Sequence, residues 1–315
     1  MIKYLLKRLA LMIVTLFVII TATFFLMNSM PGNPVRSQAK RLPEDVAVKM
    51  EHKYGLDKPV TQRYGIYLKN LLKGELGDSF VTPGLSVNNK IKENFPPSVR
   101  IGLQSVAFGL IVGVLLGIIA GFKRETAIDY GVMFIAILGV SIPSFVLATL
   151  IQIVLGGSGG LPIAGWYDST TPFLQTFKYT VLPTLALSFG GIATYARYMR
   201  ASVLEVIGQD YILTAKAKGL STLNISLKHI LRNAILPIIT ILGPQIATII
   251  TGTVVIERIF AIPGIGNALI DAIYAKDYNI IMGLTIFFSA LYILSILIVD
   301  ILYSVIDPRI KLEGK

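Results

Sequence analysis

Hydrophobic residues along this chain gather into long runs that are separated by polar, glycine-containing and basic segments. A helix needs about 20 apolar residues to cross the roughly 30 Å hydrocarbon layer of a membrane. Six runs approach or exceed that length, at residues 9–27, 101–122, 128–155, 181–196, 235–256 and 280–299. The pattern therefore predicts an all-α integral membrane protein with six transmembrane helices.

The first apolar run follows Lys3, Lys7 and Arg8, as the hydrophobic core of a secretory signal peptide would. Such a core is normally about 7 to 15 residues long and is followed by a cleavage site of the small-x-small type. This run is longer, and no such site follows it. We expect it to remain attached as the first transmembrane helix.

A long polar segment, residues 31–98, separates the first two runs. Within it, apolar side chains recur at helical spacing between residues 60 and 72, at Tyr64, Tyr67, Leu68, Leu71 and Leu72. This spacing predicts an amphipathic helix. The segment is therefore expected to fold as a small cap on the outer face of the membrane.

The second run carries glycine at every fourth position, at Gly109, Gly113, Gly117 and Gly121. Residues four apart share one face of a helix, and a face of glycine lets a neighbouring helix approach closely. We interpret this strip as a packing surface, either within the chain or against a second membrane subunit.

Between the fourth and fifth runs lies a basic stretch that favours helix, residues 197–237. A short helix over residues 210–220 is expected to end at Gly219, because glycine readily adopts the positive φ of a helix C-terminus. A second helix should then start near Thr222 and lead into Leu236 and Pro237. Two interpretations stay open on composition alone: a compact knob that a partner could move, or an ordinary basic loop.

Lysine and arginine in short loops mark the cytoplasmic side of a membrane protein. With the N-terminus inside, the inner segments hold Lys3, Lys7, Arg8, Lys123, Arg124, Arg197, Arg200, Lys216, Lys218, Lys228, Arg232, Arg309, Lys311 and Lys315. The two short outer loops hold only Lys178, Arg258 and Lys276. The basic outer segment 31–98 does not weigh against this orientation, because long loops translocate largely regardless of charge. Both termini and the Gly219 turn are therefore expected in the cytoplasm.

The composition agrees with a chain that lies mostly in lipid, since 54% of its residues are hydrophobic and 15% are charged. A formal net charge of +11 could indicate nucleic acid as a partner, but the basic residues are spread among the loops. Membrane topology explains them better, and no nucleic-acid partner is expected. The absence of cysteine leaves neither disulfides nor thiolate metal sites.

Polar residues inside the apolar runs are few. They are Ser141, Pro143, Ser144 and Gln152 in the third run, and Gln245, Thr248 and Thr251 in the fifth. Intramembrane polar groups are candidates for a translocation path, although hydroxyls also bond to the backbone of their own helix. Asp300, at the inner end of the sixth run, is expected at the cytoplasmic interface.

Signatures of catalysis are absent from the sequence. It has no G-x-x-x-x-G-K-[ST] phosphate loop, no G-x-S-x-G elbow and no H-E-x-x-H helix. His52 and His229 are expected on opposite sides of the membrane, too isolated for a metal site. We therefore expect no catalytic residue, no bound metal and no cofactor.

The basic stretch resembles the cytoplasmic loop of ATP-binding-cassette importer permeases, most closely those for oligopeptides and dipeptides. The family pattern is an acidic residue, two small residues, three of any kind and a glycine. Leu213, Thr214, Ala215 and Gly219 stand in those places, with Leu213 in place of the acidic residue. The resemblance implies that this loop forms coupling helices that dock into ATPase subunits, through Asp210, Tyr211, Thr214, Ala215, Lys216, Ala217, Gly219 and Leu220.

Other segments carry the same resemblance along nearly the whole chain. In the outer segment these are residues 31–34, 54–59 and 74–77, which resemble the loop that meets the substrate-binding protein in peptide permeases. Their glycines and prolines could equally be plain turn residues. The last outer loop, residues 257–266, and the tail residues 307–309 are also similar to peptide permeases.

The resemblance implies a bacterial plasma-membrane permease that imports oligopeptides or dipeptides with four kinds of partner: a second permease, two cytosolic ATPases that bind the ATP, an external binding protein and the peptide. The expected regions are an N-terminal transmembrane helix (1–30), an outer cap loop (31–98), a transmembrane domain (99–307) with coupling helices at about 200–234, and a cytoplasmic tail (308–315). Nickel or chelated-metal import is the nearest alternative. A stand-alone channel or secondary transporter is the alternative of another class.

Overall fold

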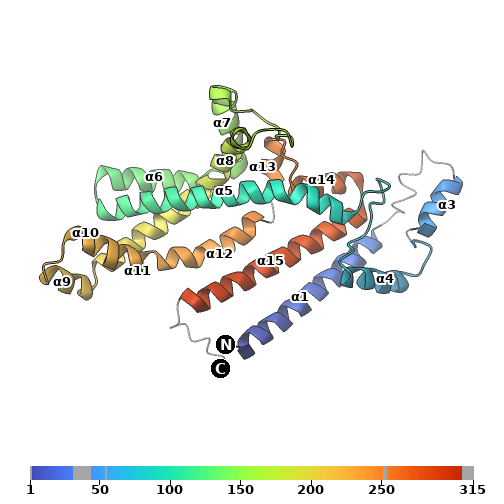
Figure 1. Cartoon of the computed structure of the whole chain (residues 1–315), viewed down its shortest axis with the longest axis horizontal. Helices are drawn as coiled ribbons and strands as arrows, with labels where there is room; N and C mark the ends of the chain where they lie inside the picture. Colours follow the sequence, from blue (N-terminus) through green and yellow to red (C-terminus); the bar gives the residue numbers. More distant parts are fainter. Residues whose placement is uncertain (1, 31–43, 54, 251–253, 307–315) are drawn as a thin grey trace. The chain divides into compact units, whose positions relative to one another are not determined.

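The structure is a computed structural model that describes residues 2–30, 44–53, 55–250 and 254–306. Every regular element within these ranges is a helix, which confirms the all-α prediction (Figure 1). The chain divides into two compact units, which are described separately. Unit 1 combines residues 1–98 with 263–315, and unit 2 comprises residues 99–262.

Unit 1 brings together the two ends of the chain. Its helices are α1 (Ile2–Ser29), α3 (Glu44–Lys53), α4 (Val60–Leu72), the first part of α5 (Val87–Phe122), α14 (Ile265–Ala275) and α15 (Tyr278–Ile306). The two longest complete ones, α1 and α15, pack side by side (Figure 1). Helix α4 has the bounds that its hydrophobic spacing predicts.

A small hydrophobic core joins α4 to the two long helices of unit 1. Phe24 of α1, Tyr67 of α4, and Met282 and Ile286 of α15 are buried together. The Tyr64 hydroxyl lies 2.6 Å from the Thr21 hydroxyl and adds a polar link between α4 and α1. Helix α4 of the outer segment is therefore packed against two membrane-length helices.

The loop between α4 and α5 is held by a buried carboxylate. Asp277, which directly precedes α15, accepts a hydrogen bond from the Ser79 hydroxyl at 2.5 Å and another from the Phe80 amide at 3.2 Å. Asp277 is 4% exposed. Since a buried carboxylate must be hydrogen-bonded to persist, this contact fixes the loop at the start of α15.

Unit 2 is built around one long helix. It contains the rest of α5, α6 (Ala127–Ser141), α7 (Ser144–Leu155), a 3-10 turn (Ser158–Gly160), α8 (Phe173–Ile207), α9 (Asp210–Ala217), α10 (Thr222–Asn224), the π-helical segment η2 (Ile225–Leu231), α11 (Arg232–Ala234), α12 (Leu236–Ile250) and α13 (Val254–Ile259). Helix α8 packs against α5, α6, α7 and α12.

The third apolar run, residues 128–155, was expected to form one transmembrane helix. The structure has two helices there, α6 and α7. Helices α6 and α7 meet at an angle of 109°. Ile142, at the junction, has extended backbone angles (φ −82°, ψ 123°). Pro143 explains the break, because proline disfavours helical geometry in the residue before it and cannot donate to the helix.

Four described helical segments are long and apolar enough to cross a membrane: Lys7–Ser29, Val87–Phe122, Thr222–Gly243 and Tyr278–Ile298. Counting the bent pair α6 and α7 as one span gives five. The remaining predicted run, 181–196, lies within α8, whose buried residues include Ala186, Ser188, Gly191 and Ala193. Such small residues suit a helix that packs among other helices, so the count of six stays a prediction.

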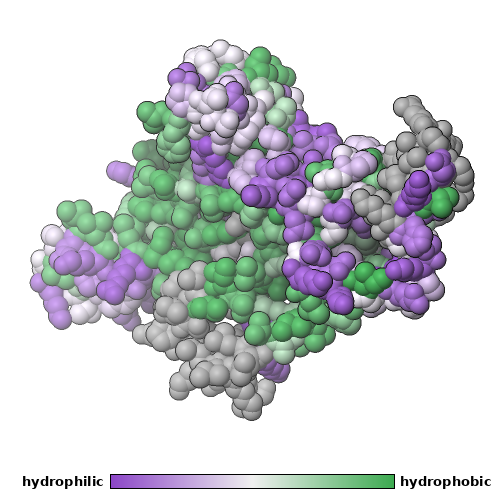
Figure 2. Space-filling view, turned by 45° about the vertical axis from the view of Figure 1, so that its right-hand side comes forward, coloured by the Kyte–Doolittle hydropathy of each residue, from purple (hydrophilic) through white to green (hydrophobic). Residues whose placement is uncertain are grey.

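The membrane character also appears on the surface, where large hydrophobic side chains are widely exposed (Figure 2). Phe134 of α6 and Ile153 of α7 are 62% and 72% exposed, for example. Exposure on this scale is unusual for a soluble monomer and expected for helices that face lipid.

Candidate functional site

The glycine of the basic stretch ends a helix as its sequence predicts. Gly219 follows α9 with φ +74°. The Gly219 amide donates to the Lys216 carbonyl at 2.9 Å, and the Leu220 amide donates to the Ala215 carbonyl at 3.3 Å. These two bonds form a Schellman motif, which satisfies carbonyls that the end of a helix would otherwise leave open. The chain thus reverses within two residues.

The second helix of this region begins at Thr222, three residues after Gly219. The Ser221 hydroxyl accepts a hydrogen bond from the Asn224 amide at 3.4 Å and caps α10. Helical structure then continues through η2 and α11, and α12 begins at Leu236. No sequence pattern predicted the π-helical turn in η2, a geometry often found at functional positions.

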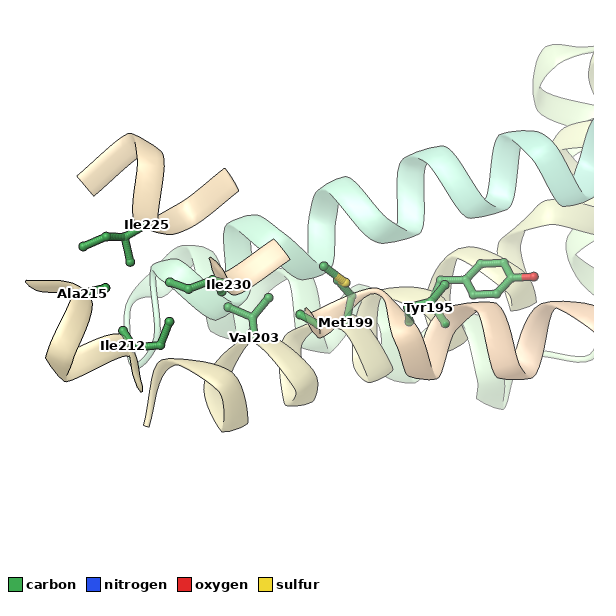
Figure 3. Packing of buried hydrophobic residues seen from close by; sticks show 9 residues of the cluster. Tyr195, Met199, Val203, Ile212, Ala215, Ile225 and Ile230 are labelled. Carbon is green, nitrogen blue, oxygen red and sulfur yellow. The ribbon is translucent and has the colours of Figure 1, made fainter. Parts of the chain in front are cut away.

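We use the name coupling knob for residues 209–234, which comprise α9, the Gly219 turn, α10, η2 and α11. Its inner face belongs to the largest hydrophobic core of unit 2 (Figure 3). Ile212 and Ala215 of α9 pack there with Ile225 and Ile230 of η2 and with Val203 of α8. Complete burial of one isoleucine stabilises a fold by roughly 1.5 to 3 kcal/mol. The knob is thereby fixed to the end of α8.

The outer face of the coupling knob is apolar but unburied. Tyr211 is 42% exposed, Leu213 59%, Leu223 70% and Leu227 56%. Lys216, Lys218 and Lys228 are exposed on the same segment. A protruding surface that combines large apolar side chains with positive charge fits a protein partner.

The residues that sequence analysis assigned to coupling differ in their exposure to solvent. Asp210, Tyr211, Thr214, Lys216, Ala217, Gly219 and Leu220 are exposed, whereas Ala215 is buried. The assignment missed the exposed leucines of α10 and η2, because it followed the short motif around Gly219. Their sequence signal is Leu223 and Leu227 at i, i+4 spacing, which places both on one face of a helix.

The glycine strip of α5 faces α8. A β-carbon built on Gly113 would lie 2.7 Å from the Ile192 carbonyl oxygen, and one on Gly117 would lie 2.5 Å from the Ala196 carbonyl oxygen. A β-carbon on Gly121 would be 2.7 Å from Val203, while Gly109 leaves slightly more room, at 3.3 Å from Ser188. At Gly113, Gly117 and Gly121 the two helices are therefore closer than a β-carbon allows.

The polar residues of the third run have different surroundings. Ser141, Pro143 and Ser144 lie exposed at the bend between α6 and α7. Gln152 is already engaged, since its amide donates to the Ile163 and Ile259 carbonyls at 3.0 and 2.8 Å. It links α7 to α13 and to the loop after α7.

The polar residues of the fifth run are only partly described. Gln245 is half-buried on α12, and its amide nitrogen lies 3.2 Å from the position of a β-carbon on Gly191 of α8. Thr248 belongs to α12. Thr251 lies outside the described residues, as do residues 31–34, Tyr54 and residues 307–309 of the sequence motifs.

An ion pair that sequence analysis missed joins α6 to α8. Arg200 donates to both carboxylate oxygens of Asp129, at 2.5 and 2.7 Å. The Asp129 side chain is 1% exposed, and it also accepts from the Glu125 amide at 3.0 Å. Arg200 lies on the last part of α8, within the stretch that meets the glycine strip and shortly before the coupling knob.

Comparison with known protein families gives two matches that together cover most of the chain. Residues 113–312 match the family described as binding-protein-dependent transport system inner membrane component. Residues 1–98 match the family described as the N-terminal part of such membrane components.

Individual relatives match over nearly their full length. The chain is 43% identical over 316 residues to a dipeptide transport system permease protein of Bacillus subtilis, covering 100% of both chains. It is 42% identical over 313 residues to a dipeptide transport system permease protein of Lactococcus lactis, covering 99% of this chain and 100% of that one. Identity to an oligopeptide transport system permease protein of Haemophilus influenzae is 42% over 312 residues, with the same coverage.

Proposed function

This chain belongs to the binding-protein-dependent transport system inner membrane components, and from that premise we propose that it is the permease subunit of an ATP-driven importer of dipeptides or oligopeptides. Relatives of both peptide classes, similar over 99% or more of this chain, support the substrate class. The coupling knob, which is buried on one side and apolar on the other, is the structural observation that carries the proposal.

In this proposal the outer face of the knob docks into an ATPase subunit. Tyr211, Leu213, Leu223 and Leu227 supply apolar contact area, and the exposed lysines fix orientation by charge. Ile212 and Ala215 transmit movement, because they lie in the same core as Val203 of α8. Closure of the ATPases on ATP would then rock α8 and the helices packed on it. Since the chain has no phosphate-binding loop, the ATP is bound by the partner subunits.

The complete importer, as proposed, has a second permease, two cytosolic ATPases and an external substrate-binding protein. Both termini and the coupling knob lie in the cytoplasm of a bacterium, and the segment 31–98 lies outside. Ser141 and Ser144 at the exposed bend, together with Gln245, Thr248 and Thr251, are the proposed path residues. The amide of Gln152 is excluded from this set because two carbonyls already occupy it.

The direct test of the proposed function is growth on a peptide. A leucine-requiring strain of the source bacterium, with tri-leucine as its only leucine source, should stop growing when this chain is deleted and resume when it is restored. Uptake of nickel should not change in the same cells. Undiminished growth without the chain, or a loss of nickel uptake alone, would overturn the assignment to peptides.

The turn at Gly219 gives a test of coupling. Valine at this position should lower peptide uptake by about tenfold, because a left-handed φ is unfavourable for L-residues and most of all for β-branched ones. A steric clash would not contribute, because nothing lies within 4 Å of the β-carbon position at Gly219. Asparagine, which tolerates this φ, is the matched variant and should keep uptake near the wild-type level.

Uptake into cells and ATP hydrolysis by the purified complex should be measured together for both Gly219 variants. We expect Gly219→Val to assemble in the membrane, with ATP hydrolysis no longer tied to transport. Equal uptake by the valine and asparagine variants would show that the shape of the turn does not matter for coupling.

A further inference from the structure

Unit 1 contains a cavity that the coupling mechanism does not use. Its volume is about 690 Å³, and residues of α4, of the segments on either side of α4 and of α15 line it. Sites for small molecules usually measure about 300 to 1,000 Å³. The cavity is therefore large enough for a ligand of several amino-acid residues.

A buried hydroxyl at the wall of this cavity has no partner. Tyr67 of α4 is 9% exposed, and its hydroxyl oxygen forms no hydrogen bond within the described part of the chain. The ring itself packs against Phe24, with centroids 5.5 Å apart. Leaving such a group unpaired is unfavourable, and a ligand that hydrogen-bonds to it would recover the loss.

Charges of both signs line the same cavity. Lys58 and Arg63 lie at the N-terminal end of α4, whereas Glu75 and Asp78 follow its C-terminal end. Among the described residues none of these four forms an ion pair. Burial lowers the pKa of the Arg63 guanidinium, since its charge has lost part of its hydration. The cavity thus offers separate positive and negative groups to a ligand.

The separation of these charges indicates the length of the ligand. From Arg63 to the end of α4 at Leu72 the helix rises about 14 Å, at 1.5 Å per residue. An extended peptide advances about 3.3 to 3.6 Å per residue, so about four residues cover this distance. A free peptide carries one negative and one positive terminus, which matches the charges at the two ends of α4.

We propose that this cavity binds a free peptide of about three to five residues in an extended form. Its carboxylate meets Lys58 and Arg63, and its ammonium group meets Glu75 and Asp78. Tyr67 and the Asn70 amide, which also lines the cavity, bond to the peptide backbone. The site recognises termini rather than side chains, which suits a transporter of varied sequences. The choice of a peptide rests on the proposed function.

The test uses the full chain in lipid nanodiscs and radiolabelled tetra-alanine in equilibrium dialysis. Wild type should bind the probe saturably, and tetra-alanine with an acetylated N-terminus and an amidated C-terminus should bind at least about tenfold more weakly. Arg63→Gln should weaken binding of the free probe by about tenfold. Lys69→Gln is the matched control, because Lys69 is exposed on α4 and does not line the cavity.

Tyr67→Phe keeps the buried ring and removes only the hydroxyl, so it tests the site even where Arg63→Gln folds poorly. It should weaken tetra-alanine binding several-fold without lowering the thermal midpoint, because the hydroxyl that it removes is unpaired in the free protein. Absence of saturable binding to wild type, or equal binding by wild type and both variants, would overturn the inference. The inference would also be overturned if the variants bound tetra-alanine normally and weakened only the docking of the external binding protein. Each of these results leaves the growth test on tri-leucine untouched, so failure of the site and failure of the proposed function are distinguishable.

Discussion

Alanine at Gly117 is expected to reduce sharply the amount of folded protein in the membrane. The added β-carbon would lie 2.5 Å from the Ala196 carbonyl oxygen and 2.6 Å from the Met199 β-carbon. Neither atom is the free end of a flexible side chain, so α5 and α8 would have to separate along the whole strip. Overpacking typically costs about 1 to 3 kcal/mol, and a clash with the backbone belongs at the upper end of that range. Lost dispersion contacts add to it, because they hold membrane helices together.

The matched control is alanine at Gly190, a glycine of α8 with nothing within 4 Å of its β-carbon position. Both substitutions add one methyl group to a glycine in a helix of unit 2. The yield of monodisperse protein and its thermal midpoint in detergent should fall for Gly117→Ala and should not fall for Gly190→Ala, where alanine favours the helix and has room. Equal behaviour of the two variants would mean that the close approach of α5 to α8 is not needed for folding.

The glycine strip shows what a sequence pattern reveals about packing and what it omits. Repetition at every fourth position identifies a smooth face on one helix, because helical geometry is local. The identity of the helix that meets this face depends on residues 188–203, far along the chain, and no local pattern encodes it. Sequence analysis therefore left open whether the strip packs within the chain or against another subunit.

The two helices and the glycine turn of the coupling knob were predictable because they also depend on local sequence. The positive φ of Gly219 follows from the chemistry of glycine, and the structure confirms it. The π-helical turn of η2 and the burial of Ile225 and Ile230 result from packing against α8 and α9. Such tertiary contacts override local preference, so sequence analysis predicted an ordinary helix where the chain has a π-helical turn.

The third apolar run, residues 128–155, shows what composition alone leaves out. Its composition predicted a single span, although Pro143 within it already argued for a break. Hydrophobicity over a window of about 20 residues does not register one residue that changes the direction of the chain. The helices α6 and α7 meet at 109° around Pro143. The proline therefore explains the direction of the chain, whereas the apolar composition indicates only that the run lies in lipid.

The ion pair of Arg200 could not be predicted from the sequence, because its partner Asp129 lies 71 positions away. In the sequence Arg200 counted as one of several basic residues on the inner side of the membrane. In the structure it is the charge that allows a carboxylate to be 1% exposed. Long-range pairs of this kind need coordinates, because no spacing rule connects two separate helices.

Methionine at Arg200 is expected to destabilise the protein by about 3 to 5 kcal/mol, because it leaves the Asp129 carboxylate buried without a counter-ion. The double variant Asp129→Leu with Arg200→Met should recover most of the loss, since an apolar pair of similar size can replace a buried ion pair. Arg197→Met is the matched control, as Arg197 is exposed on the same helix and its loss removes the same charge.

Thermal midpoints and peptide uptake of these three variants separate the role of the pair from that of charge alone. Because α8 leads directly into the coupling knob, we expect the single variant Arg200→Met to lose uptake together with stability. The double variant should regain both, which would assign to the pair the task of holding α6 against α8 rather than a task in transport chemistry. Recovery of stability without recovery of uptake would contradict this view and make the charge of Arg200 itself part of the transport cycle. A stable, active single variant would instead mean that the carboxylate is protonated or relocated when its partner is gone.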